Sequence, residues 1–139
     1  MKTTAQVVVI GGGVVGCSVL YHLTKKGWKD VMLLERDQLT SGSTWHAAGG
    51  FHTLNGDPNV AMLQSYTVSL YQELERISGQ SCGMHKSPGI MLADTPERME
   101  FLKMTVARGR YLGMDTDIIP VAEAKKYFPF IEDRYFLGA

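Results

Sequence analysis

Three glycines that follow a short apolar run restrict the fold of this chain more than any other feature of its sequence. Gly11, Gly13 and Gly16 have the spacing G-x-G-x-x-G and come directly after QVVVI, residues 6–10. In such a turn the first glycine permits a tight bend and the second lets a ligand approach the backbone. The third lets the following helix pack closely on the strand. The pattern therefore predicts a strand, a tight turn and a helix.

The segments after the glycines complete a βαβ unit. Residues 14–26 have apolar side chains at helical spacing, and residues 31–35 (VMLLE) form a second buried strand. Parallel strands in such units are covered on both faces. The amides of Val14 and Val15 lie at the positive end of the expected helix, where phosphate binds. We therefore predict an α/β fold that binds a dinucleotide.

The acidic residue at the end of the second strand indicates which dinucleotide. Glu35 lies about 20 residues after the glycines, where a carboxylate accepts hydrogen bonds from a ribose. It favours FAD or NAD over NADP, although Arg36 weakens this preference. The long loop at residues 39–56 offers hydroxyl groups and small residues that could line a flavin. From the residues alone, a mobile surface loop explains it equally well.

The remainder of the chain is expected to begin a second domain. We place the dinucleotide-binding unit and its loop at residues 1–56 and a helical connection with the start of a further domain at 57–139. The spacing predicts helices and one strand in this part, at residues 58–78, 89–93 (the strand), 96–112 and 120–127. Because one βαβ unit is a small part of a doubly wound sheet, we expect the chain to be the N-terminal part of a longer protein.

Composition excludes several classes of partner. Fourteen basic and fourteen acidic residues cancel, so a nucleic-acid partner has no electrostatic support. No apolar run is long enough to cross a bilayer. Cys17 and Cys82 have no metal-ligand spacing, and we expect no metal site. A cytoplasmic location is expected.

A histidine and a tryptophan stand together in the loop sequence STWHAAGG. By itself, His46 is most simply a hydrogen-bonded or solvent-facing loop residue, and nothing near it in sequence suggests a metal site. Trp45 and Trp28 are interpreted as packing residues. The residues alone leave the role of the histidine open.

The segment VVVIGGGVVGCSVLYHLTKKGWKDVMLLERDQLTSGSTWHAAGG resembles the FAD domain of the dimethylglycine and sarcosine dehydrogenase family. This family belongs to the D-amino-acid-oxidase-like flavoproteins, and the resemblance continues through KSPGIMLADTPERMEFLKMTVARGRYLGMD and YFPFIED. It implies a Rossmann-like FAD-binding domain, incomplete here, followed by the start of an α+β substrate domain. One departure is Gly50, where close relatives often have leucine.

The resemblance also implies the cofactor and its site. In the family, the histidine that corresponds to His46 carries FAD covalently. The implied cofactor-binding residues are Gly11, Gly13, Val14, Val15, Gly16, Glu35, Arg36, Gly42, Ser43, Thr44, Trp45, His46, Ala47, Ala48, Gly49 and Gly50.

The family reaction is the oxidation of an N-methyl group on a small amino acid. The resemblance implies an electron acceptor, either an electron-transfer flavoprotein or oxygen. It places the substrate-side catalytic residues, and a domain that can bind tetrahydrofolate, beyond residue 139, so no catalytic residue is assigned. Two alternatives stay open: an amine oxidase with noncovalent FAD, and a dinucleotide-binding module without catalytic activity.

Overall fold

The computed structural model describes residues 3–139, which fall into two compact units. The first extends to Gly50 and the second comprises Phe51–Ala139. Each unit is described by itself. The domain boundary expected at residue 56 stays a prediction.

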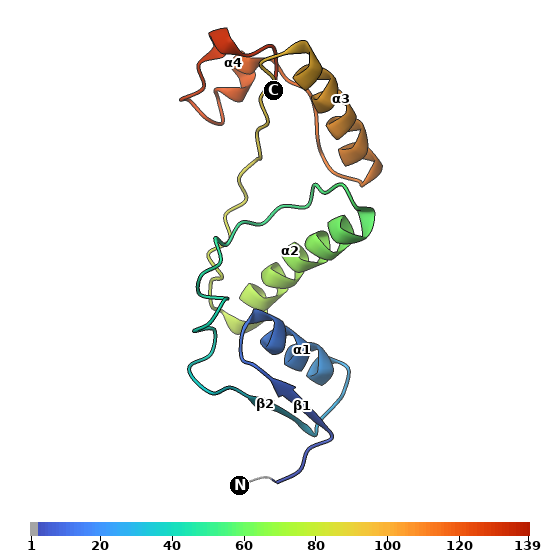
Figure 1. Ribbon diagram of the computed structural model, residues 1–139, viewed down its shortest axis with the longest axis vertical. Coiled ribbons are helices and arrows are strands. Elements are labelled where there is room, and N and C mark those ends of the chain that lie inside the picture. The colour runs from blue at the N-terminus through green and yellow to red at the C-terminus, as the bar shows by residue number, and fades with distance from the viewer. Residues whose placement is uncertain (1–2) are drawn as a thin grey trace. The chain divides into compact units, whose positions relative to one another are not determined.

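The first unit is a βαβ unit. Strand β1 (Val7–Ile10) and strand β2 (Val31–Leu34) pair in parallel, and helix α1 (Val14–Lys25) connects them. The register runs from Val7 opposite Val31 to Ile10 opposite Leu34. Helix α1 lies along both strands (Figure 1). The predicted α/β class and the parallel pairing are thus confirmed.

Only one face of the strand pair is covered. A side-chain carbon of Val9 faces α1, close to Gly16. Because side chains alternate along a strand, Val8 and Ile10 point to the opposite face, and Ile10 is 85% exposed. The prediction of strands buried on both faces is therefore wrong for this unit. Among its described residues, α1 is the only helix available to cover the sheet.

The second unit begins with a long capped helix, α2 (Pro58–Ser78). The Asp57 carboxylate accepts hydrogen bonds from the amides of Asn59 (2.7 Å) and Val60 (3.1 Å). These bonds satisfy two of the amides that a helix leaves unpaired at its start. Gly79 ends the helix at φ +69°, a left-handed conformation that glycine adopts without strain. Both predicted ends of this helix are confirmed.

Helix α3 (Pro96–Tyr111) is capped in the same way. The Thr95 hydroxyl accepts a hydrogen bond from the Arg98 amide at 3.2 Å. The C-terminus lies beside this helix (Figure 1). Gly138 lies against the side chain of Met99, in the first half of the helix.

The predicted strand at 89–93 and the predicted helix at 120–127 both form only in part. Ala93 makes a single antiparallel bridge to Gly138 and no continuous ladder. The helix is one turn, α4 (Val121–Ala124), and a 3-10 turn, η1 (Asp133–Tyr135), follows. Ala139 exchanges two backbone hydrogen bonds with Ile119. Too few neighbouring residues are paired in this region to extend either element.

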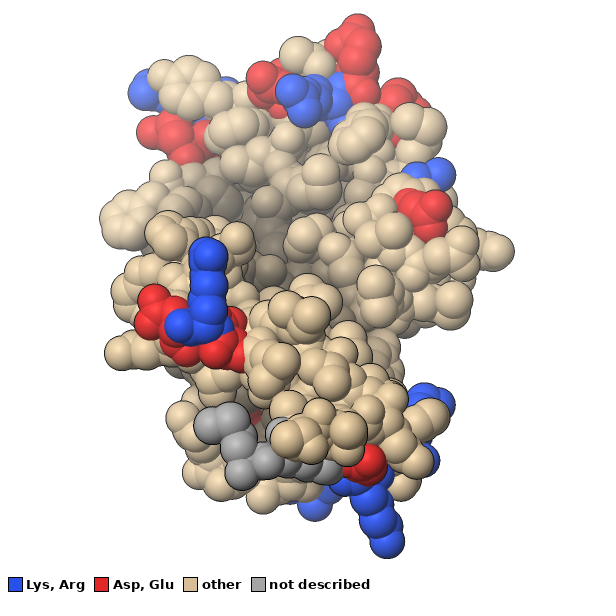
Figure 2. Space-filling model, turned by 60° about the horizontal axis from the view of Figure 1, so that its bottom comes forward, with Lys and Arg blue, Asp and Glu red and all other residues tan. Residues whose placement is uncertain are grey.

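A small apolar core holds these C-terminal segments together. Buried side chains of Val121, Ala124 and Ile131 form its centre, and Ile90, Leu92, Ile119 and Phe136 pack around them. On the face shown in Figure 2, basic and acidic side chains lie interspersed and most of the surface is uncharged.

Candidate cofactor site

The glycine turn lets β1 and α1 approach each other more closely than residues with side chains would allow. Gly11 has φ +102°, and its amide donates to the Leu34 carbonyl oxygen at 2.8 Å. A β carbon on Gly16 would lie far inside the van der Waals contact distance from the Gly11 carbonyl oxygen and 3.0 Å from the Gly11 carbonyl carbon. The predicted reasons for the first and third glycines are therefore visible in the geometry.

The N-terminus of α1 has free hydrogen-bond donors. Its N-cap, Gly13, has extended backbone and provides no side-chain cap, and the first turn holds no acidic residue. The Val14 amide donates to the Thr44 hydroxyl at 2.9 Å. Within the described part of the chain, the amides of Val15 and Gly16 have no partner. Such an end, with its positive dipole, suits a phosphate group.

The Glu35 carboxylate lies against the glycine turn. It accepts hydrogen bonds from the amides of Gly12 (2.6 Å), Arg36 (2.7 Å) and Asp37 (3.0 Å). These bonds lower the pKa of Glu35 below its usual value, and the Gly12 amide has the largest effect. The carboxylate is thus held ionised beside the turn, in a position where it can also accept a hydrogen bond from a sugar hydroxyl.

The loop after β2 folds back onto the same turn. The Thr40 amide donates to the Gly12 carbonyl oxygen at 3.0 Å, and the Leu39 side chain covers Gly12. Thr40 has φ +66°, which is strained for a β-branched residue. The Trp45 amide closes the bend by donating to the Thr40 carbonyl oxygen at 3.0 Å.

His46 projects from this loop with a defined orientation. Its Nδ1 lies 3.0 Å from the Gly42 carbonyl oxygen. Because a carbonyl oxygen only accepts, Nδ1 carries the hydrogen, and Nε2 of the neutral ring keeps its lone pair. The ring is exposed. Trp45 is 79% exposed, so its interpretation as a packing residue is wrong.

The structure brings together only part of the predicted site. The glycines, Val14, Glu35 and Thr44 meet around the turn. The remaining small residues of the predicted site are exposed; they are Gly42, Ser43, Ala47, Ala48, Gly49 and Gly50.

Sequence reasoning missed Gly12, Leu39 and Thr40. A β carbon on Gly12 would lie 2.5 Å from Leu39 Cδ2 and 3.1 Å from the Glu35 carboxylate. The run of three successive glycines was the available signal for Gly12. Nothing in the sequence pattern indicated that Leu39 would cover it.

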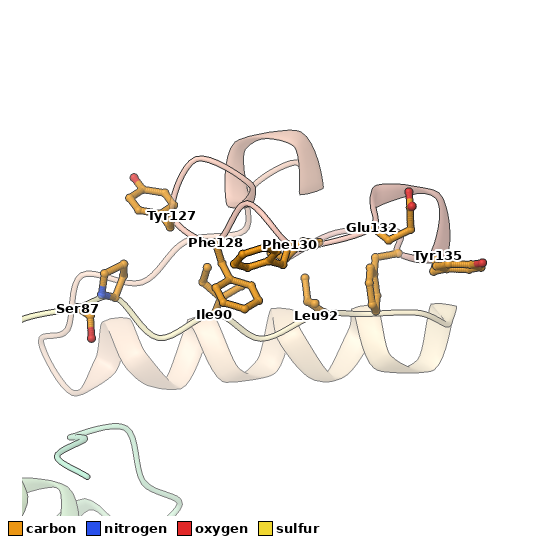
Figure 3. A pocket seen from close by; sticks show the side chains of 11 residues that line it. Ser87, Ile90, Leu92, Tyr127, Phe128, Phe130, Glu132 and Tyr135 are labelled. Carbon is orange, nitrogen blue, oxygen red and sulfur yellow. The ribbon is translucent and has the colours of Figure 1, made fainter. Parts of the chain in front are cut away.

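An open hollow of about 710 Å³ lies in the second unit (Figure 3). Its lining is mainly aromatic and aliphatic, with Phe128 and Phe130 edge to face at 5.6 Å between ring centroids. Glu132 is the charged residue of the lining. Tyr127 and Tyr135 also line the hollow, and no residue of the predicted site does.

The described residues contain no group of three or more His, Cys, Asp or Glu side chains that could hold a metal ion. None of the helices formed by residues 3–139 is long and apolar enough to cross a membrane.

Comparison with protein families gives one match that covers nearly the whole chain. The family described as FAD dependent oxidoreductase (DAO) matches residues 6–139. The fold agrees with that of a solved structure: L-proline dehydrogenase from P. horikoshii superposes with a TM-score of 0.86 at 24% identity. That alignment covers 99% of this chain and 36% of the other.

Several curated relatives are similar over almost the full chain. Dimethylglycine dehydrogenase of Rattus norvegicus is 40% identical over 138 residues, which is 99% of this chain and 16% of the relative. Sarcosine dehydrogenase of Homo sapiens is 37% identical over 97% of this chain and 15% of the relative. A pyruvate dehydrogenase phosphatase regulatory subunit of Mus musculus is 36% identical over all of this chain and 16% of the relative. The chain thus spans about one sixth of the length of these proteins.

Proposed function

This chain belongs to the FAD dependent oxidoreductase family, and from that premise we propose that it helps oxidise an N-methyl group of a small amino acid. The substrate would be of the dimethylglycine or sarcosine type, with FAD attached covalently to His46. Identities of 36–40% to dehydrogenases of these two amino acids support the substrate class. One observation carries the cofactor part: the loop that holds His46 is hydrogen-bonded to the glycine turn.

The residues around the glycine turn fit a dinucleotide. The close approach of Gly16 to Gly11 leaves room for backbone and for no side chain. The free amides of Val15 and Gly16 would hold the pyrophosphate, and Glu35 would hold the adenosine ribose. When bound, FAD supplies a two-electron acceptor for the oxidation of the substrate carbon.

The His46 side chain has the chemistry that covalent attachment needs. The hydrogen bond to the Gly42 carbonyl oxygen keeps the proton on Nδ1 and leaves the lone pair on Nε2. We therefore assign Nε2 as the attachment atom. Exposure of the ring makes that atom accessible from solvent. The exposed loop residues from Gly42 to Gly50 would line the flavin side of the site.

The test is acid precipitation of the full-length polypeptide after reconstitution with FAD. Yellow colour that stays in the pellet is expected for the parent protein. His46→Ala is expected to release its flavin into the supernatant while still binding FAD before acid is added. His85→Ala, which changes an exposed loop histidine of the second unit, is the matched control and should retain the colour. Colour retained by His46→Ala contradicts the attachment site.

A second candidate function is that of a dinucleotide-binding module without catalytic activity. The observation that favours it is the 36% identity to a phosphatase regulatory subunit over the whole chain. Anaerobic addition of dimethylglycine or sarcosine to the reconstituted protein separates the two candidates. Bleaching of the flavin absorbance supports the oxidoreductase, and unchanged absorbance with every N-methyl amino acid supports the module.

Three expectations stay predictions. The electron acceptor (an electron-transfer flavoprotein or oxygen) and a tetrahydrofolate-binding part are implied by the family resemblance, and the cytoplasmic location was expected from composition. The names of the three relatives above carry the word mitochondrial.

A further inference from the structure

Helix α1 has no cap of its own and takes one from the loop. Its N-cap residue, Gly13, has no side chain that could accept a hydrogen bond from the first turn. The Thr44 hydroxyl accepts that bond instead, from the Val14 amide at 2.9 Å, although the two residues are 30 positions apart. A cap hydroxyl contributes stability only when its residue is held beside the helix end. This bond therefore joins the loop to the helix.

Thr44 is the best-shielded residue of its loop segment. From Ser41 to Gly50 it alone is half-buried, and the other nine residues are exposed. Its hydroxyl oxygen also packs against the turn, because a β carbon on Gly13 would lie only 3.1 Å away. The glycine at position 13 thus provides the space that the threonine occupies.

The segment around Thr44 is bent into successive turns that include His46. The Trp45 amide donates to the Thr40 carbonyl oxygen, and the His46 amide donates to the Ser43 carbonyl oxygen at 3.2 Å. The His46 ring bonds to the Gly42 carbonyl oxygen within the same segment. A shift of Thr44 would therefore move His46 with it.

We propose that Thr44 is a positioning residue that anchors the His46 loop to the N-terminus of α1. The anchor to α1 rests on the geometry above, whereas its effect on flavin attachment rests on the proposed function. Among the described residues, two hydrogen bonds join residues 39–50 to the glycine turn, and only this one uses a side chain. It is therefore the one that a substitution can remove without changing the backbone.

The first test measures hydrogen exchange in full-length protein without cofactor. In Thr44→Val the peptide that contains the Val14 amide should exchange about two- to tenfold faster, as expected for the loss of one hydrogen bond. Thr44→Ser keeps the hydroxyl and should exchange as the parent does. Thr24→Val is the matched control. Thr24 lies on the same helix, and the substitution removes its hydroxyl, which donates a hydrogen bond to the Tyr21 carbonyl oxygen.

The second test follows flavin attachment over time, as the fraction of bound flavin that stays with the acid-precipitated polypeptide. Thr44→Val should attach flavin several-fold more slowly at equal FAD occupancy, and Thr44→Ser should restore the parent rate. If valine disturbs folding, Thr44→Ala removes the hydroxyl with less bulk.

The outcomes separate the anchor from the proposed function. Unchanged exchange at Val14 in both Thr44→Val and Thr44→Ala overturns the anchor. Faster exchange with an unchanged attachment rate overturns the positioning role. If the parent protein holds no acid-stable flavin, the proposal of covalent attachment is wrong. The exchange measurement then still decides whether Thr44 anchors the loop.

Discussion

Substitution of Gly16 by alanine should separate helix α1 from the glycine turn. The added β carbon would overlap the Gly11 carbonyl oxygen, lie 3.0 Å from the Gly11 carbonyl carbon and lie 3.5 Å from Val9 Cγ1. The first two atoms belong to the backbone, so no side-chain rotation relieves the overlap. The helix or the turn has to move by about one ångström or more. The same movement would displace the amides proposed to hold the pyrophosphate.

The size of the effect follows from the kind of atoms involved. Overpacking by one methyl group costs about 1–3 kcal/mol when side chains can adjust. Because the added methyl group at position 16 would overlap backbone atoms, we expect a loss of stability in the upper part of this range, about 2–3 kcal/mol. At about 1.4 kcal/mol per factor of ten, this corresponds to roughly 30- to 150-fold faster exchange of the amides that open with the βαβ unit.

Hydrogen exchange resolved to residues 7–25, together with titration of FAD, measures this prediction. Gly16→Ala should accelerate exchange in that range and weaken FAD binding. Gly42→Ala is the control for exchange, because no atom lies within 4 Å of the added β carbon and its φ is not in the left-handed range. Its stability should change by less than about 0.5 kcal/mol. Exchange within about twofold of the parent in Gly16→Ala, with unchanged FAD affinity, would refute the close-packing argument.

Two further predictions concern pH and helix capping. The pKa of Glu35 is lower in the folded chain than its usual value of 4.5, so folding favours the ionised carboxylate. The contribution of this carboxylate to stability is therefore complete above about pH 4.5 and is lost as pH falls through the lower folded pKa. Measurements of unfolding stability across acidic pH should show this loss, and in Glu35→Gln the stability should depend less on pH. Asp57→Ala removes the acceptor for two amides at the start of α2 and should destabilise that helix by about 1 kcal/mol, measured by thermal unfolding, whereas Asp57→Asn should lose less. Equal unfolding temperatures for alanine and asparagine at this position would contradict the capping argument.

Local patterns predicted the elements whose determinants lie within a few residues. Asp57 with Pro58, and Thr95 with Pro96, mark helix starts through bonds to amides two or three residues on. The strand at 89–93 was not predictable in this way. Its pairing depends on Gly138, more than 40 residues away, and only one bridge forms. Partner distance along the chain thus separates these two helix starts, which were predicted correctly, from this strand, which formed only in part.

The sequence by itself determined the βαβ unit, the glycine turn and the acidic residue beside it, because spacing and residue type are sufficient for each. Only the tertiary structure decided that the loop after β2 returns to that turn. Contacts across about 30 residues, between Thr44 and Val14 and between Leu39 and Gly12, depend on where the folded backbone places their atoms. The spacing of apolar residues along the sequence does not indicate such contacts. The exposure of Trp45 was decided in the same way, because burial depends on the neighbours that the fold supplies.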